Sequence, residues 1–387
     1  MVPRVVAVLF LAGTTAQYTV TLTSHSSVPV ISSANAAGSG QSHCDMAFNP
    51  SYIPASPSSP TAGLLVRLCC DDTCMGHGLK PNTLASDGLP AERIGFAPCD
   101  LKSGVCSDTL PDFNLDPSTS AEDPRAFLFG EFYYNFYYSG SSNDTAGPPC
   151  EGDQCTVKLA KTRTPLNASS WEPVALLPWH RNGCCIRKPV GEKSYCVWGE
   201  GPDPLPGLGI SYTMDINSGV FVQTPWQAPA PSHLSNDSMW LLPLGSDQDE
   251  IKLEAGSHPV ELSTGDWLHF YAAATPGWVE NGNYTVGWVV LDKDYPSTII
   301  QRSVEHIMVP TFQYETLCNG TTPCPYVGER ARVIFMCSAD RIATDEFRLF
   351  FGGGDGNVGT AVVTVAVDRR RNSAATPAAS GFGSFVG

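Results

Sequence analysis

The apolar positions of this chain fall into short runs of strand length, separated by turns rich in Gly, Pro, Asn and Asp. The stretch 122–138, EDPRAFLFGEFYYNFYY, shows this pattern most clearly. Pro124 has no N–H to donate to a sheet, so the Glu-Asp-Pro triplet belongs where a strand begins. Side chains two apart on a strand share a face, which places Asp123 and Arg125 on the same side. An ordinary strand-entry turn with a surface ion pair is the alternative interpretation.

A unit of three or four short strands recurs five times between residues 44 and 368, and no convincing amphipathic helix interrupts it. Such a radial repeat predicts an all-β fold, a five-bladed β-propeller, with a large sandwich as the alternative. We expect an N-terminal arm or edge strand at 17–43 and a disordered tail at 369–387. The third segments of the five units are residues 93–104, 156–174, 209–223, 284–303 and 357–368.

The first strands of propeller blades converge on one central funnel, so polar residues at that phase of each unit are candidates for a site. Structural Asn and Asp turns are the alternative for any one of them. The candidates are Asn49, Asp123, Arg125, Arg181, Asn182, His258 and Asp355.

Charge and composition narrow the class of ligand. The formal net charge is −15, and only 16% of the 387 residues are charged. Nucleic acids and anionic membranes are bound by clustered Lys and Arg, so neither is expected as a partner. An acidic chain is compatible with a neutral ligand such as a glycan.

Several features predict a secreted protein. Residues 1–16 have a basic start and a short apolar core, as a signal peptide does, although a buried strand is the alternative. No later run is long enough to span a membrane as a helix. The 14 cysteines include close pairs that predict disulfides. These are Cys99/Cys106, Cys150/Cys155 and Cys318/Cys324. The glycosylation sequons are Asn143, Asn167, Asn236, Asn283 and Asn319.

We expect no metal and no cofactor. Zinc is the competing interpretation for Cys70 and Cys74, but a second close pair with His at ligand spacing is missing from the sequence. The doublets Cys69-Cys70 and Cys184-Cys185 cannot be paired from sequence.

The order of motifs resembles glycoside hydrolase family 130, the β-mannoside phosphorylases and mannosidases. The resemblance covers residues 44–368 and rests on AFNP, LLVRL, EDPR, YYNFYY, HRNGCC, GSHPVELSTGDWLHFYA and LFFGGGDGNVGTAVV. Its most specific part is 284–315, where Asp292, Pro296, Arg302, Pro310 and Glu315 fall at family-like spacing. The resemblance independently implies the five-bladed propeller.

The resemblance also implies roles for individual residues. Asp123 matches the general acid, and Arg125 completes that motif. Asp355 matches the acidic residue that holds the non-reducing-end sugar, while Asn49 and Arg67 match residues lining the pocket. Tyr271 is a further candidate for substrate binding.

Departures from the family pattern bear on the reaction. The phosphorylases carry a His-Arg pair where this chain reads Trp198-Gly199-Glu200, and a His where it has Ala272. An inverting hydrolase needs a second carboxylate to activate water. Glu200 is the first candidate for this base and Glu254 the second; Glu200 as a plain loop residue is the alternative.

We therefore expect a secreted enzyme that hydrolyses β-mannosides or related glycans. Three alternatives stay open: a non-catalytic glycan-binding propeller, another five-bladed glycosidase such as an arabinan- or fructan-cleaving enzyme, and a phosphorylase. The phosphorylase would bind inorganic phosphate through cations such as Arg67, Arg181 and Lys188.

Overall fold

The protein is an all-β, five-bladed propeller, as the recurring strand pattern predicts. The computed structural model describes residues 17–32, 44–70, 84–110, 113–118, 120–140, 156–177, 181–199, 207–223, 240–242, 250, 252–275, 283–316 and 332–368. Among these residues, no helix is both long and apolar enough to cross a membrane.

Each blade is an antiparallel sheet built from consecutive strands. Blade 1 contains β2 (Cys44–Ile53), β3 (Gly63–Cys70) and β4 (Glu92–Pro98). Blade 2 contains β5 (Ser120–Phe129), β6 (Phe132–Gly140), β7 (Thr156–Thr162) and β8 (Glu172–Leu177). Blade 3 contains β9 (Arg181–Cys185), β10 (Ser194–Gly199), β11 (Leu208–Thr213), β12 (Val222–Gln223) and β13 (Trp240–Leu242).

Blades 4 and 5 follow the same order. Blade 4 contains β14 (Lys252–Ala255), β15 (Val260–Glu261), β16 (Trp267–Ala274), β17 (Asn283–Leu291) and β18 (Ile299–Arg302). Blade 5 contains β19 (Arg332–Ala343), β20 (Glu346–Gly353), β21 (Asn357–Asp368) and the N-terminal strand β1 (Gln17–His25). The short helical pieces are η2 (Ala168–Ser170), η3 (Ile216–Ser218) and α2 (Gln313–Thr316).

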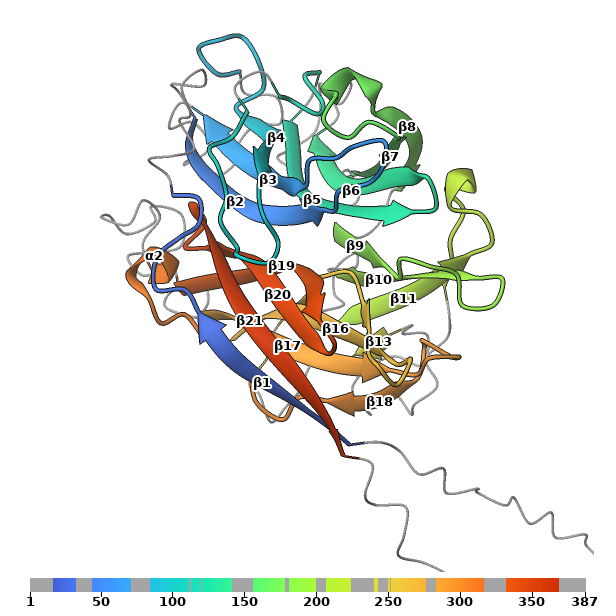
Figure 1. Ribbon diagram of the computed structural model, residues 1–387. Coiled ribbons are helices and arrows are strands. Elements are labelled where there is room, and N and C mark those ends of the chain that lie inside the picture. Colours follow the sequence, from blue (N-terminus) through green and yellow to red (C-terminus); the bar gives the residue numbers. More distant parts are fainter. Residues whose placement is uncertain are drawn as a thin grey trace, which may run out of the picture.

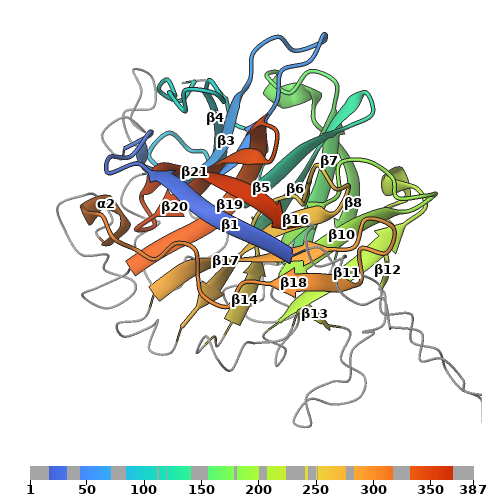
Figure 2. The same cartoon turned by 60° about the horizontal axis from the view of Figure 1, so that its bottom comes forward.

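The first strands of the blades form a ring. β2 contacts β5, β5 contacts β9, β9 contacts β14, β15 contacts β19, and β19 contacts β2 again. Figure 2 shows the sheets from a second side, with β1 and β21 of blade 5 lying across the front of the view. The ring therefore brings residues from distant parts of the sequence together on its inside.

The N-terminal strand closes the ring. β1 lies antiparallel to β21, with Gln17 opposite Asp368 and His25 opposite Ala361. The expected N-terminal arm thus supplies the outer strand of blade 5. A short parallel strand pairing between β17 and β19 also joins blades 4 and 5. These two blades therefore form one continuous nine-stranded sheet.

The hydrophobic core lies between neighbouring blades. Between blades 2 and 3, for example, the ring centroids of Phe136 and Trp198 are 5.2 Å apart and those of Trp198 and Phe221 are 5.3 Å apart, both edge-to-face. Aromatic pairs of this kind add to the stabilisation from buried apolar area. The aromatic run that the sequence shows after Asp123 is therefore mostly interface between blades.

Disulfides connect neighbouring strands and close one loop. The predicted bond Cys99–Cys106 is present. In the first doublet, Cys70 is bonded to Cys44. In the second doublet, Cys185 is bonded to Cys196. Cys184 and Cys337 are buried free thiols. The predicted pairs 150/155 and 318/324 lie outside the described residues.

Several inner strands bulge at a residue in the left-handed conformation. Asn49, Asp123 and Asn182 have φ values of 47°, 49° and 57°. The pairing register shifts at these places in blades 1, 2 and 3. Asn and Asp adopt this conformation more readily than most residues, which explains why the recurring polar positions are of these types.

Closure by β1 is testable through Tyr18. Its side chain is 2% exposed, its backbone N–H donates to Gln301 Oε1 at 2.8 Å, and its hydroxyl contacts Thr264 and Asp266. We predict that Tyr18→Ala lowers the free energy of unfolding by about 3–5 kcal/mol, as for other buried aromatic truncations. Urea unfolding measures this change.

Tyr18→Phe should cost only about 1 kcal/mol, because it loses the hydroxyl contacts but keeps the ring. Thr21→Ala, at an exposed position of the same strand, is the matched control and should be close to neutral. Equal stability of Tyr18→Ala and Thr21→Ala would contradict a closing role for β1.

Candidate functional site

Asp123 sits at the bulge of β5 and is 5% exposed. Asn49 of β2 donates from Nδ2 to Asp123 Oδ1 at 2.7 Å, and Arg67 of β3 donates from Nη1 to the same oxygen at 3.2 Å. The structure thus brings together three residues that the sequence places in one pocket. Gly352 permits this approach, because a Cβ there would lie 2.2 Å from the Asn49 side-chain oxygen.

Arg67 is shared among three carboxylates. Besides Asp123, it pairs through Nη2 with Glu122 Oε2 at 3.0 Å and with Glu92. Its guanidinium also lies 4.8 Å from the centre of the Phe48 ring. One positive charge therefore holds several negative charges close together on blades 1 and 2.

Asp355 lies on the turn between β20 and β21, with a φ of 51°. Burial raises the pKa of its carboxyl to about 6; Arg67 opposes this shift, while Asp123 and Glu254 add to it. These interactions place Asp355 in the same electrostatic environment as both carboxylates. Its proton equilibrium therefore falls within the range in which many enzymes work.

Glu254 of β14 is the centre of a second set of hydrogen bonds, and it is 3% exposed. Tyr284 donates its hydroxyl to Glu254 Oε1 at 2.7 Å, and Lys252 Nζ lies 2.8 Å from the same oxygen. Asn182, at the bulge of β9, donates from Nδ2 to Oε2 at 2.7 Å. Blades 3 and 4 therefore hold this carboxylate from three sides.

Arg125 lies near both groups of carboxylates and is fully buried. Although burial alone would lower the pKa of Arg125, the neighbouring Cys337 and Cys184 and then Asp123 and Glu254 raise it. Its Nη1 donates to the Pro124 carbonyl at 2.9 Å. Nε and Nη2 have no hydrogen-bond partner among the described residues. Arg125 thus supplies a buried positive charge near Asp123 and Glu254.

Two predicted substrate-binding residues lie away from these contacts. His258 is fully buried, with Nδ1 accepting from the Cys185 N–H at 2.9 Å and its ring 4.7 Å from that of Phe127. Burial lowers the pKa of His258 well below its usual value. A neutral, enclosed imidazole packed between blades has no surface to offer a sugar, so this position corrects the sequence interpretation.

Tyr271 is fully buried as well. Its hydroxyl donates to Glu250 Oε1 at 3.2 Å and accepts from Arg302 Nε at 3.1 Å. The ring packs in the core between blades 3 and 4. Tyr271 therefore belongs to a structural ion cluster, and this corrects its assignment to substrate binding.

Two further candidates, Glu200 and Arg181, lie wholly or partly outside the described residues. Glu200 lies outside the described residues, directly after β10. Arg181 begins β9 and pairs through its backbone with Gly199, but its side chain is not among those described.

Sequence reasoning missed Glu92, Lys252 and Tyr284. Lys252 could have been found, because it is two residues before Glu254 and so shares its face of the strand. The contacts of Glu92 and Tyr284 depend on pairing between strands, which no short motif encodes. Among the described residues, no group of three or more His, Cys, Asp or Glu is placed to hold a metal ion.

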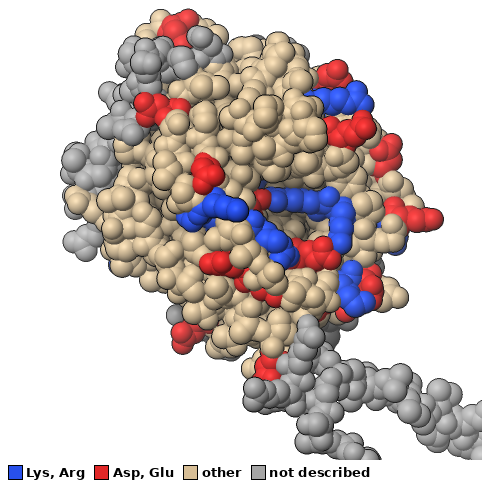
Figure 3. Space-filling model, in the orientation of Figure 1, with Lys and Arg blue, Asp and Glu red and all other residues tan. Residues whose placement is uncertain are grey.

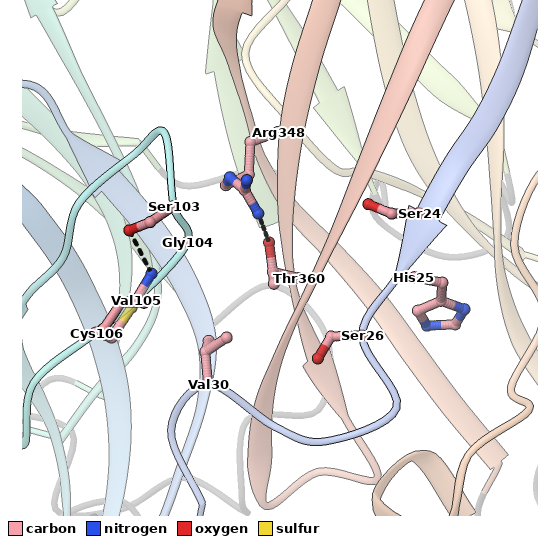
Figure 4. Close-up of a pocket in the computed structure, with 10 residues that line it drawn as sticks. All are labelled: Ser24, His25, Ser26, Val30, Ser103, Gly104, Val105, Cys106, Arg348 and Thr360. Carbon is pink, nitrogen blue, oxygen red and sulfur yellow. Dashed lines mark hydrogen bonds between the residues drawn. The ribbon is translucent and has the colours of Figure 1, made fainter.

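A cavity of about 470 Å³ lies elsewhere, beside the end of β1. Figure 4 shows Ser24 and His25 on one side of it, the Cys106 loop on the other, and Arg348 bonded to Thr360 between them. No residue of the Asp123 or Glu254 contacts lines it. Figure 3 shows Lys and Arg gathered around a hollow near the middle of one face, with Asp and Glu beside them and further charged residues toward the edge of the view.

Comparison with known proteins supports the family resemblance. The family model of glycoside hydrolase family 130, described as beta-1,4-mannooligosaccharide phosphorylase, matches residues 236–368. A 1,2-beta-oligomannan phosphorylase from Thermoanaerobacter sp. (strain X514) is 28% identical over 300 residues, covering 72% of this chain and 81% of the relative. The chain is thus similar to glycoside hydrolase family 130 and divergent from these relatives.

Solved structures agree with the fold of this protein. Beta-1,2-mannobiose phosphorylase from Listeria innocua superposes with a TM-score of 0.63 at 15% identity, over 89% of this chain and 96% of that chain. A second structure, described with glycoside hydrolases of family 130 that target beta-1,2 mannosidic linkages in Candida mannan, gives a TM-score of 0.58 at 15% identity, over 82% and 84%. At this identity the likeness establishes the fold alone.

The raised pKa of Asp355 yields a testable prediction. If Asp355 accepts hydrogen bonds from a sugar, its ionised form is the binding form. We therefore expect kcat/KM on a β-mannoside to rise with pH through an apparent pKa near 6, which is the value burial gives Asp355. Asp355→Asn should remove this inflection and raise KM about tenfold or more.

The pH dependence of folding stability provides an independent check, because stability should fall with pH where kcat/KM rises. Because the native state holds this proton more tightly than the unfolded chain, the contribution of Asp355 to stability falls as pH rises from about 4 to 6. Chemical unfolding at several pH values should show that Asp355→Asn lacks this fall. A pH profile for Asp355→Asn identical to that of the wild type would refute the assignment.

Proposed function

We propose that this protein is an inverting hydrolase of β-mannosides or closely related glycans, with Asp123 as general acid and Glu254 as general base. The single observation that carries the proposal is the environment of Glu254. It is a buried carboxylate in the same electrostatic environment as Asp123 and Asp355. An inverting hydrolase needs two such carboxyl groups, one on each side of the scissile bond.

The surroundings of Glu254 support water as the acceptor. Glu254 pairs in register with Ala272, the position at which the family's phosphorylases carry a His. Gly199, part of the other position that lacks basic residues, packs on Glu254 so closely that a Cβ would lie 2.7 Å from its Cα. The positions that lack the basic side chains thus lie beside Glu254 in the fold.

Glu254 also has the capacity to act as a base. A carboxylate offers about four lone-pair positions. Tyr284, Lys252 and Asn182 use three of them, which leaves one on Oε2 for a water molecule. Asp123 would give its proton to the leaving oxygen as the bond from that oxygen to C1 breaks. Water would form the new bond to C1 and release its proton to Glu254.

Two of the cations that the sequence offered for a phosphate site, Arg67 and Lys188, are engaged by carboxylates of the chain. Arg67 is shared by Asp123, Glu122 and Glu92. Lys188 pairs with Glu261 at 2.8 Å and lies 5.3 Å from the Trp267 ring. Phosphate would therefore have to compete with carboxylates of the chain itself.

Phosphorolysis is the second candidate function. It is favoured by the names of the curated relatives and by Arg125, whose Nε and Nη2 lack an acceptor among the described residues. Buried guanidinium groups bind phosphate well when they can reach it.

The same proposal places the protein in the secretory pathway. The signal-like residues 1–16, the disulfides and the exposed sequon at Asn167 support this. We predict that protein secreted from a eukaryotic host lacks residues 1–16 and carries a glycan at Asn167, as read by intact mass before and after deglycosylation. Asn167→Gln is the control; retention in the cytosol with reduced cysteines would contradict the proposal.

The reaction is tested on a panel of β-mannosides with and without inorganic phosphate. We predict that free mannose is released at a rate that phosphate does not change. Asp123→Asn should lose about 10²–10⁴-fold in kcat, because general acid assistance is worth that much. It should still bind sugar, as measured by calorimetry.

Asp294→Asn is a matched control, since the Asp294 side chain is 63% exposed on a turn of blade 4. It should keep wild-type activity. Phosphate-dependent release of mannose 1-phosphate would establish phosphorolysis in place of hydrolysis. Sugar binding without turnover of any mannoside would indicate a glycan-binding protein.

A further inference from the structure

The cavity beside the end of β1 contains a buried guanidinium whose hydrogen-bond acceptors are all neutral. Arg348 of β20 lines this cavity of about 470 Å³ and is 9% exposed. Its Nε and Nη2 donate to the backbone carbonyls of Leu101 and Lys102, both at 2.6 Å, and its Nη1 donates to Thr360 Oγ1 at 3.3 Å. In the part of the chain that the structure describes, Arg348 forms no ion pair with an Asp or Glu. Its positive charge is therefore available to a ligand.

Arg348 also keeps hydrogen-bond donors for a ligand. A guanidinium group has five N–H donors. The bonds to the two carbonyls and to Thr360 leave one N–H on Nη1 and one on Nη2. The two terminal nitrogens of a guanidinium can bind both oxygens of one carboxylate. Burial lowers the pKa of Arg348, and the charges of Asp100 and Glu346 offset only part of this effect. An anionic ligand would therefore stabilise the charged form of Arg348 further.

The loop closed by the Cys99–Cys106 disulfide fixes this guanidinium in place. The Gly104 N–H donates to the Asp100 carbonyl at 2.9 Å, which folds the loop into a tight turn. Gly104 has a φ of 74°, and a Cβ there would lie 2.4 Å from Arg348 Nη1. A glycine is therefore required for the loop to wrap around Arg348. Donors that are fixed before a ligand arrives bind it at a lower entropic cost.

Hydroxyl groups and apolar side chains form the rest of the cavity wall. Figure 4 shows Ser24 and Ser26 on the side of β1, whereas the His25 ring points away from Arg348. The other lining residues are Val30, Ser103, Gly104, Val105, Cys106 and Thr360. The described residues that line the cavity include no Asp or Glu, so the ammonium of a ligand would find no carboxylate there.

We propose that this cavity binds a small organic carboxylate that carries hydroxyl groups, the chemical class to which sugar acids belong. Arg348 would hold the carboxylate, and the serine hydroxyls on both sides would bond to the hydroxyls of the ligand. An amino acid fits less well, because its ammonium would remain unpaired. The cavity volume of about 470 Å³ suits such a ligand, since small-molecule sites measure about 300–1,000 Å³.

The position of the cavity predicts an effect on the closure of the ring. Ser24 belongs to β1, which pairs with β21, whereas Ser103 belongs to the loop that follows β4 of blade 1. A ligand in contact with both would connect the N-terminal strand to blade 1. No described residue that bonds to Asp123 or Glu254 lines the cavity, so this inference is independent of the proposed function.

Calorimetric titration of the protein with glucuronate, a hydroxylated carboxylate, tests the site directly. The wild type should bind glucuronate and should not bind mannose in this cavity, because mannose has hydroxyls but no carboxylate. Arg348→Met should bind glucuronate about 10–100-fold more weakly, the loss expected from hydrogen bonds to a charged group. Arg348→Lys should bind with intermediate affinity, because it keeps the charge but not the paired donors. Glucuronate should also raise the melting temperature of the wild type.

Two further variants keep the test decisive. Arg163→Met is the matched control, since the Arg163 side chain is 59% exposed on blade 2, and it should bind glucuronate as the wild type does. Ser24→Trp fills the cavity from an exposed position and leaves the bonds of Arg348 in place, so it should weaken binding even if Arg348→Met does not fold. Wild-type protein that does not bind glucuronate would overturn the inference. So would equal binding by the wild type and Ser24→Trp, or sulfate binding as tight as that of glucuronate.

Activity measurements separate this site from the proposed active site. Arg348→Met and Ser24→Trp should keep the wild-type kcat/KM on a β-mannoside, because neither residue contacts Asp123 or Glu254. Loss of glucuronate binding in these variants with unchanged turnover supports the inference. Competitive inhibition of turnover by glucuronate that Arg348→Met does not relieve would place glucuronate in the active site and contradict the inference. The binding result stands whether or not the wild type hydrolyses mannosides.

Discussion

The left-handed backbone positions on the inner strands are the constraint on which the site depends. Asn49, Asp123 and Asn182 each stand where an inner strand bulges. A regular strand would alternate its side chains between the two faces of the blade, toward the neighbouring blades. The bulge breaks this alternation and turns one polar side chain toward the next inner strand, as the bonds Asn49–Asp123 and Asn182–Glu254 show. Asn and Asp are needed because they tolerate the conformation and also provide the polar group.

Charge balance is the second consequence of this arrangement. The inner strands and the turn at Asp355 bring carboxylates from three blades into one electrostatic environment, in which Arg67, Arg125 and Lys252 provide the positive charge. Buried like charges raise one another's pKa unless cations separate them. Burial raises the pKa of Asp355 to about 6, and Arg67 opposes that rise.

The sequence was sufficient for the propeller and for the polar bulge positions of its inner strands. Strand-length runs predicted five units, and the recurring Asx residues Asn49, Asp123 and Asn182 stand at bulges because bulge chemistry is local. His258 and Tyr271 were assigned wrongly, since their fate depends on packing between blades: a polar residue next to the right motif can still face the core. The surroundings of Glu254 could not be predicted from the sequence for the same reason. They combine a bulge in blade 3 with the register of two strands in blade 4, and no segment of the sequence contains both.

The residues that match the family pattern and those that depart from it have different structural roles. The family-like spacing at 284–315 includes Arg302, which pairs with Glu250, and Glu315, whose Oε2 accepts from the backbone N–H groups of Thr311 and Phe312 at 2.7 and 2.9 Å. These residues build blade 4 and the short helix α2, so their retention preserves the scaffold and says little about the acceptor. The departures at Gly199 and Ala272 both touch Glu254, and neither changes a blade. The scaffold of blade 4 and the surroundings of Glu254 are therefore built from different residues.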